Sequence, residues 1–100
     1  MYESANLKKV KTLKELAPEG MAAYLAFNDA AMKDGAIPKK YKELIALAVA
    51  FTTQCPYCIE VHAKAAKAAG CTDAEIAEAA VVAAALRAGG AITHATHAIG

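Results

Sequence analysis

The chain has 100 residues and a formal net charge of +1 at pH 7, and 57% of its residues are hydrophobic. That length predicts one domain over residues 1–100. The near-neutral charge excludes a large basic surface, and the lysine-rich start of the chain lacks the wider footprint with aromatic residues that a nucleic-acid site needs. A chain this short cannot bury long apolar helices alone. We therefore expect a homo-oligomer and no nucleic-acid partner.

The first 16 residues, MYESANLKKVKTLKEL, contain no apolar stretch typical of a signal peptide. No run of about 18 strongly apolar residues stands out. The alanine-rich residues 74–86, for example, are interrupted by Glu75 and Glu78. We expect a cytoplasmic protein without a membrane partner. Thiols rest reduced in that compartment, so a disulfide there is transient or catalytic rather than structural.

The spacing of apolar residues predicts helices throughout the chain. No segment alternates with period two, so we expect an all-α fold without a β-sheet. In chain order, we expect a short basic amphipathic segment, four longer helices and a short final helix or turn, over residues 7–16, 18–33, 38–53, 56–70, 72–90 and 92–99.

Several residues mark the expected helix ends. Pro38 suits a first helical turn, Gly70 suits a left-handed cap, and the Thr72 to Glu75 segment has the form of a capping box. We expect the fifth helix to end at Gly89-Gly90. The third helix carries no charge after Glu43, so we expect it to be buried on most sides.

Cys55 and Cys58 lie in a Cys-Pro-Tyr-Cys box, and His62 follows four residues after the second thiol. A helical step of three residues brings two cysteines within disulfide range. The two thiols and the imidazole share one helix stripe with small residues, so we expect them to face the interior. Pro56 makes Cys55 the expected N-cap, where unpaired N–H groups and the helix dipole lower the pKa of Cys55 and of Cys58.

Because His62 can take the proton of Cys58, we assign Cys58 as the nucleophile and Cys55 as the resolving thiol. The reverse order stays open, since a helix-capping thiol can be the more acidic one. If the third and fourth helices form an antiparallel hairpin turning near Gln54, Glu43 lies about 16 Å before the turn and His62 about 12 Å after it. Side chains span that offset, so the Glu43 carboxylate can orient the imidazole. Spacing alone also allows Glu43 to lie at the edge of a solvated lysine-rich face.

The spacing of four residues resembles the signature of AhpD-type alkylhydroperoxidases in the carboxymuconolactone decarboxylase superfamily. In this signature, eleven residues separate Glu43 from Cys55, two separate Cys55 from Cys58, and three separate Cys58 from His62. The resemblance extends over residues 18–98. It implies an all-α fold with a redox helix hairpin and assembly into homotrimers or homohexamers. It also implies Cys58 as the peroxide-attacking thiol, with His62 and Glu43 as its proton relay. Tyr57 stands where the best-studied members have a histidine.

We therefore predict an oxidoreductase of the peroxidase type, which reduces small hydroperoxides through a Cys55–Cys58 dithiol/disulfide cycle without a metal or organic cofactor. An external dithiol or disulfide reductase would restore the thiols. One alternative is a disulfide relay that passes electrons to a partner peroxiredoxin. A second is a zinc-binding or structural module that uses the two cysteines and His62 with His94 or His97. A lactone decarboxylase is a third, by superfamily analogy alone.

Four further residues keep more than one interpretation. His94 and His97 can share a helical face toward the redox pocket, a subunit interface or solvent, and we favour a structural or interface role. Cys71 is expected to be a half-buried thiol without a partner, with a regulatory or intersubunit disulfide as the alternative. Tyr57 either donates a hydrogen bond at the mouth of the site or packs.

Overall fold

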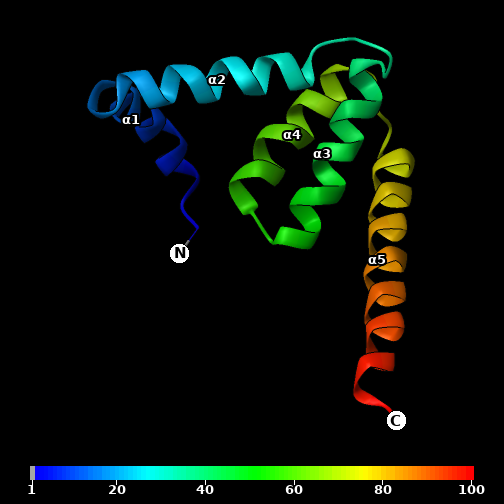
Figure 1. Cartoon of the computed structure of the whole chain (residues 1–100). Coiled ribbons are helices and arrows are strands. Elements are labelled where there is room, and N and C mark those ends of the chain that lie inside the picture. The colour runs from blue at the N-terminus through cyan, green and yellow to red at the C-terminus, as the bar shows by residue number, and fades with distance from the viewer. Residues whose placement is uncertain (1) are drawn as a thin grey trace.

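The computed structural model describes residues 2–100 and contains helices but no strand over that range (Figure 1). The predicted all-α fold without a β-sheet is confirmed. The elements in chain order are η1 (Ser4–Lys9), α1 (Val10–Leu16), α2 (Pro18–Met32), α3 (Lys39–Thr53), α4 (Pro56–Ala68), α5 (Asp73–Ala95) and η2 (Thr96–Ala98). Figure 1 shows α3 and α4 side by side at the centre, with α2 across one end of them and α5 extending away.

The α3–α4 hairpin is closed by a tight turn. Gln54 adopts a left-handed conformation with φ 57°, and its N–H bonds to the Ala50 carbonyl. The N–H of Cys55 bonds to the same carbonyl, at 3.1 Å. These two bonds satisfy the end of α3 and reverse the chain, so the predicted hairpin near Gln54 is confirmed.

The buried core lies where α3, α4 and the start of α5 meet. Its buried members are Leu47, Ala66 and Cys71, and the partly buried side chains packed around them are Leu44, Phe51, Ala63 and Ile76.

The expectation that α3 is buried on most sides is wrong. Glu43, Leu47 and Ala50 form one buried stripe along the helix. Ile45 and Val49 lie on other faces and are 51% and 55% exposed. The absence of charge on α3 after Glu43 therefore reflects an apolar surface as well as an apolar core.

The predicted end of the fifth helix at Gly89-Gly90 is also wrong, because α5 continues to Ala95. Neither glycine adopts a positive φ, whereas Gly70, after α4, does so at 94°. A glycine inside a helix costs about 1 kcal/mol relative to alanine, and the alanine-rich neighbours of Gly89-Gly90 favour helix. The predicted capping box at the start of α5 is confirmed, with Thr72 and Glu75 bonded to each other's backbone N–H.

The continuous helix over Asp73–Ala98 is long and apolar enough to cross a membrane, by length and composition only, and none of it is buried. The helix reaches this length because it continues through both glycines. The sequence had predicted no segment long and apolar enough to span a membrane. A single helix of this kind is weak evidence, because the core helices of soluble proteins meet the same criteria. The absence of a membrane partner stays a prediction.

Candidate thiol site

The first turn of α4 carries the two cysteines. Cys55 is the N-cap residue, as predicted, and its sulfur accepts a hydrogen bond from the backbone N–H of Cys58 at 3.4 Å. Pro56 occupies the first helical position, where its missing N–H costs nothing. Both cysteines are free thiols in this structure. A thiol at this position replaces the hydroxyl or carboxylate that usually caps a helix.

The two thiols differ in acidity. A hydrogen bond from the Cys58 side chain, followed by the bond from the Cys58 backbone, lowers the pKa of Cys55. The same side-chain bond, followed by desolvation, raises the pKa of Cys58. The predicted lowering is therefore found for Cys55, and the prediction for Cys58 is wrong. The two sulfurs are hydrogen-bond partners, so the bond that stabilises the Cys55 thiolate also disfavours loss of the Cys58 proton.

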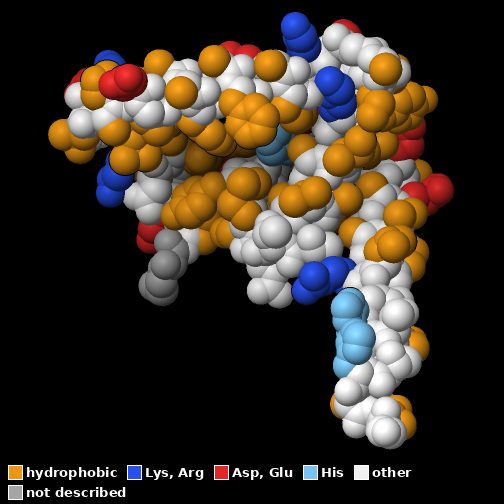
Figure 2. Space-filling model, viewed as in Figure 1, with side chains coloured by type: hydrophobic (Ala, Val, Ile, Leu, Met, Phe, Trp, Pro, Cys, Tyr) orange, Lys and Arg blue, Asp and Glu red, His pale blue; other side chains and the backbone are white. Residues whose placement is uncertain are grey.

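The thiols do not face the interior as expected. Cys58 is exposed, and Cys55 and His62 are partly exposed. Cys58 and His62 line an open groove of about 280 Å³ between the N-terminal segment, α2 and α4. The other lining residues are Leu7, Val10, Tyr24, Leu25, Asn28, Tyr57 and Val61. Figure 2 shows hydrophobic side chains around the hollow beneath α2. Cys58 is therefore accessible from this groove.

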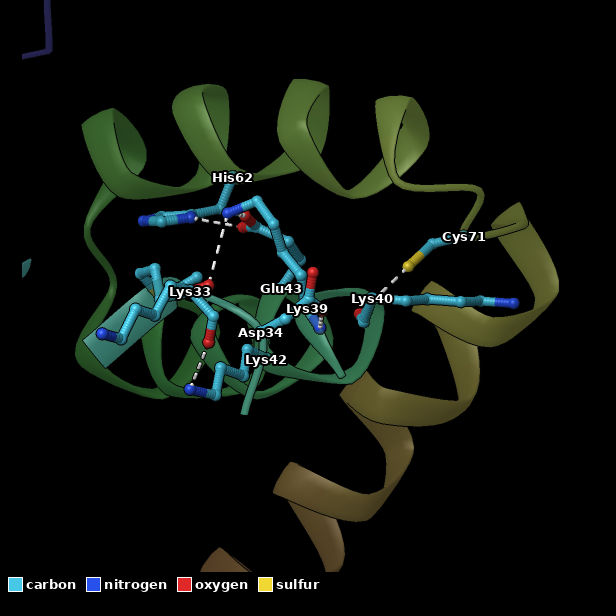
Figure 3. A network of polar contacts seen from close by, with 9 residues as sticks. Lys33, Asp34, Lys39, Lys40, Lys42, Glu43, His62 and Cys71 are labelled. Atoms are coloured by element: carbon cyan, nitrogen blue, oxygen red, sulfur yellow. Dashed lines mark hydrogen bonds and ion pairs between the residues drawn. The ribbon is translucent and has the colours of Figure 1, made fainter. Parts of the chain in front are cut away.

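Behind the groove, a buried carboxylate joins α3 to α4. Glu43 is 2% exposed, and its Oε1 lies 2.7 Å from Nδ1 of His62. Its Oε2 lies 3.1 Å from Nζ of Lys39, one helical turn earlier on α3. Figure 3 shows the His62 imidazole of α4 and the Lys39 side chain of α3 both reaching the Glu43 carboxylate. The expected approach of Glu43 to His62 is thus a direct contact, and Glu43 does not lie on a solvated face.

The contact with Glu43 relates the two imidazole nitrogens. An ionised carboxylate only accepts hydrogen bonds, so Nδ1 of His62 is the donor toward an ionised Glu43. In the neutral ring Nε2 then carries the lone pair, on the side of the ring away from Glu43.

Tyr57, between the two thiols, holds the N-terminal segment against α4. Its hydroxyl accepts hydrogen bonds from Nδ2 of Asn6 at 3.0 Å and from the backbone N–H of Glu3 at 3.1 Å. The Asn6 bond is the main cause of a lowered pKa of Tyr57. The Tyr57 ring packs against Tyr2, with centroids 4.8 Å apart, and the Tyr2 hydroxyl donates to the Glu60 carboxylate. Tyr57 thus both packs and accepts hydrogen bonds at the mouth of the groove.

The remaining candidates lie away from the groove. Cys71 is 6% exposed, more buried than expected, and its thiol donates to the carbonyl of Lys40 at 3.4 Å. The rings of His94, near the end of α5, and His97, in η2, lie 5.3 Å apart on the exposed C-terminal end of the chain, where Figure 2 shows a pale-blue patch. Over residues 2–100, no three His, Cys, Asp or Glu side chains form a group that could hold a metal ion. One chain therefore does not bring His94 or His97 to the cysteines.

Two residues at the site were missed by the sequence reasoning. Lys39 was considered only as part of a solvated lysine face, although its spacing of four residues from Glu43 is the spacing of helical ion pairs. Asn6 gave no signal, because it meets Tyr57 across 51 residues of sequence. A contact of that kind follows from the path of the N-terminal segment, which local periodicity does not specify.

These features define a small all-helical protein with a paired-thiol site on a helix hairpin. A model of the carboxymuconolactone decarboxylase family matches residues 18–99. The chain therefore belongs to the carboxymuconolactone decarboxylase family, as the resemblance predicted.

Two relatives with similar sequences are uncharacterised proteins. The chain is 51% identical to protein 4 of the cox locus of Paracoccus denitrificans, over 77% of this chain and 69% of that protein. It is 47% identical to a protein of Haemophilus influenzae, over 49% of this chain and 43% of that protein. These relatives support the family without assigning an activity.

Two crystal structures share the fold. A protein from Methanobacterium thermoautotrophicum superposes with a TM-score of 0.82 at 35% identity, covering 88% of this chain and 99% of that one. A carboxymuconolactone decarboxylase family protein from Legionella pneumophila, crystallised in its apo form, gives a TM-score of 0.76 at 35% identity, covering 80% and 71%. The helical architecture is thus the architecture of known family members.

Proposed function

We propose that this protein is a thiol-dependent peroxidase that reduces organic hydroperoxides through a Cys55–Cys58 dithiol/disulfide cycle. The observation that carries the proposal is the groove onto which Cys58 and His62 both open, with the buried Glu43 bonded to His62 behind it. The paired thiols favour redox chemistry over decarboxylation, although the family takes its name from a decarboxylase.

In the proposed cycle, Cys58 attacks the hydroperoxide. Its proton passes to Nε2 of His62, and the thiolate sulfur attacks the terminal peroxide oxygen. The O–O bond breaks, the alkoxide leaves with a proton as an alcohol, and Cys58 becomes a sulfenic acid. Cys55 then attacks that sulfur, which releases water and forms the Cys55–Cys58 disulfide. An external dithiol reduces the disulfide and restores both thiols.

The lowered pKa of Cys55 suits its part in this cycle. A resolving thiol must reach the sulfenic acid as a thiolate, and Cys55 lies one helical turn from Cys58 on the same helix. The sulfur of Cys55 also accepts the Cys58 N–H, so little movement is needed to form the bond. Neither step calls for a metal or an organic cofactor.

We further propose that the protein works as a cytoplasmic homotrimer or homohexamer. The support is the apolar surface of α5, where Val81, Val82, Leu86 and Ile92 are 60–74% exposed. Apolar side chains gathered on one helix favour association, because their burial removes apolar area from water. A second copy of this chain supplies a matching apolar face.

A disulfide relay is the second candidate, and the exposure of Cys58 favours it. A protein disulfide is bulkier than a hydroperoxide and needs a thiol that projects to the surface. In this cycle, a partner peroxiredoxin would be reduced by the Cys55–Cys58 dithiol, and the same disulfide would form without a sulfenic acid. The two candidates thus differ in the oxidant and not in the product on this chain.

The test mixes reduced protein with cumene hydroperoxide and follows peroxide loss and the location of disulfides by mass spectrometry. We expect consumption of one peroxide per chain and a Cys55–Cys58 bond. Cys71→Ser serves as the matched control, since it removes the third thiol and leaves the pair.

The outcomes separate the candidates. Slow peroxide loss, with rapid formation of the same bond from an oxidised peroxiredoxin, would replace the peroxidase with the relay. The absence of a Cys55–Cys58 bond with either oxidant would refute the redox function altogether.

A further inference from the structure

We propose that Lys39 is a positioning residue of the thiol site, whose ammonium group holds the Glu43 carboxylate in place against His62. This inference rests on the part of the proposed function in which His62 takes the proton of Cys58. It assigns a role to a residue outside the Glu-Cys-Cys-His pattern.

The first support is that both oxygens of the Glu43 carboxylate have a polar partner. At 2% exposure, Glu43 has almost no water to solvate a negative charge. Oε1 contacts His62 at 2.7 Å and Oε2 contacts Lys39 at 3.1 Å. Burying a charged carboxylate is costly unless an opposite charge or hydrogen-bond donors compensate it. Lys39 is the only cation among the described residues that contacts the Glu43 carboxylate within ion-pair distance, apart from His62 itself.

The second support is the position of Lys39 on its helix. It is the first residue of α3, where the helix dipole disfavours a positive charge. Its ammonium group nevertheless turns toward Glu43 and also donates to the carbonyl of Met32 at 3.4 Å, while its backbone N–H donates to Asp34 at 2.6 Å. The side chain is therefore held between the end of α2 and the carboxylate.

The third support is the contrast with the neighbouring lysines. Lys40 pairs with Glu75 at 3.2 Å, where both side chains are 34% exposed. Lys42 donates to the carbonyl of Lys33 at 2.6 Å. Figure 3 shows that, of these three lysines, Lys39 alone reaches the carboxylate that bonds His62. Three lysines within four residues thus have three separate partners.

The consequence for the chemistry concerns the imidazole. A charged Glu43 accepts from Nδ1–H of His62 and keeps the lone pair of Nε2 available. It also stabilises the imidazolium formed when Cys58 gives up its proton. Without Lys39, the buried carboxylate loses the partner of Oε2, and it then holds the ring less firmly. We expect the loss to slow formation of the Cys58 thiolate.

The first experiment compares Lys39→Met and Lys39→Gln with Lys39→Arg, and uses Lys40→Met as the matched control. The readout is nitrogen NMR of the imidazoles at a pH where they are neutral, with the exposed His94 and His97 as internal references. We expect the Nδ1–H form of His62 in the parent, in Lys39→Arg and in Lys40→Met. In Lys39→Met and Lys39→Gln, we expect His62 to be a mixture of the Nδ1–H and Nε2–H forms, as in the reference histidines.

The second experiment measures the alkylation rate of Cys58 by iodoacetamide in Cys55→Ser, Cys71→Ser protein. We expect Lys39→Met and Lys39→Gln to slow alkylation roughly 10-fold, the lower range for residues that orient a catalytic ligand, and Lys39→Arg to restore it. Normal alkylation and an unchanged His62 signal in both neutral variants would overturn the proposal. Alkylation of Cys58 at the parent rate in Lys39→Gln protein would overturn the role of the positive charge of Lys39. Alkylation that depends on Lys39 in a protein that consumes no peroxide would support the inference and refute the peroxidase.

Discussion

The α3–α4 hairpin and α5 differ in how far a single chain covers their side chains. In the hairpin, Glu43 on α3 is buried and lies 2.7 Å from His62 on α4. On α5, Val82 and Leu86 are 60% and 70% exposed. The polar contacts of the candidate site are completed within one chain, whereas α5 leaves apolar area uncovered. We therefore expect α5 to depend on other copies.

The largest effect should come from breaking the hairpin's chemistry. Cys58→Ser should abolish turnover completely, because a hydroxyl at that position cannot replace the thiolate as a nucleophile or form a disulfide. Peroxide consumption and a mass-spectrometric search for disulfides measure this. Cys71→Ser, which changes a buried thiol outside the groove, should retain turnover. Turnover in Cys58→Ser would transfer the attacking role to Cys55.

The second effect concerns the hairpin's packing. Leu47→Ala should destabilise the protein by about 2–5 kcal/mol, the usual cost of truncating a fully buried leucine. Leu47 is 0% exposed and lies at the centre of the core formed by α3, α4 and the start of α5. Urea unfolding at several protein concentrations gives the free energy. A change below about 0.5 kcal/mol would mean that the core is elsewhere in the assembled protein.

The third effect tests the other half of the comparison. Leu86→Ala should leave the unfolding of a single chain almost unchanged, since the side chain is 70% exposed. It should weaken association about tenfold, which corresponds to about 1.4 kcal/mol. Sedimentation equilibrium at several concentrations measures the association. A monomeric parent protein, or equal association of parent and variant, would contradict the proposed interface on α5.

The smallest effect is a difference in pH dependence within the hairpin. Because the pKa of Cys55 is lowered and that of Cys58 is raised, alkylation of Cys55 should rise at a lower pH than alkylation of Cys58. Mass spectrometry of each alkylated peptide over a pH series gives the two curves. In Cys58→Ala protein, the Cys55 curve should move up in pH, because the side-chain donor that stabilises the Cys55 thiolate is removed. Coincident curves for the two thiols would show that they do not share a proton.

Local sequence signals were sufficient for much of the hairpin. The Cys55-Pro56 pair predicted an N-cap, and helical rise alone placed Glu43 within reach of His62. Both follow from interactions over a few residues or from the geometry of two helices that share a turn. The family pattern added the expectation that Glu43, Cys55, Cys58 and His62 act together in one reaction.

Other features depended on what surrounds a residue rather than on the residue itself. The glycines Gly89-Gly90 were expected to end α5, yet with no tertiary contact forcing a turn the alanine-rich helix continues through them. The exposure of Cys58 was missed because a helix stripe of small residues resembles a buried face. The pairing of Tyr57 with Asn6 required the path of the N-terminal segment, which no period in the sequence specifies.

The contact between the rings of Tyr2 and Tyr57 has a spectroscopic consequence. The chain contains four tyrosines and no tryptophan, so its ultraviolet emission comes from tyrosine. The Tyr57 ring lies on the helix turn that carries the thiols, and the Tyr2 ring of the N-terminal segment lies 4.8 Å from it, tilted by 55°. Detachment of the N-terminal segment or a change in the oxidation state of the neighbouring sulfurs should alter the emission of this pair. The protein thus carries an intrinsic fluorophore at its own thiol site, and kinetics there can be followed without an added label.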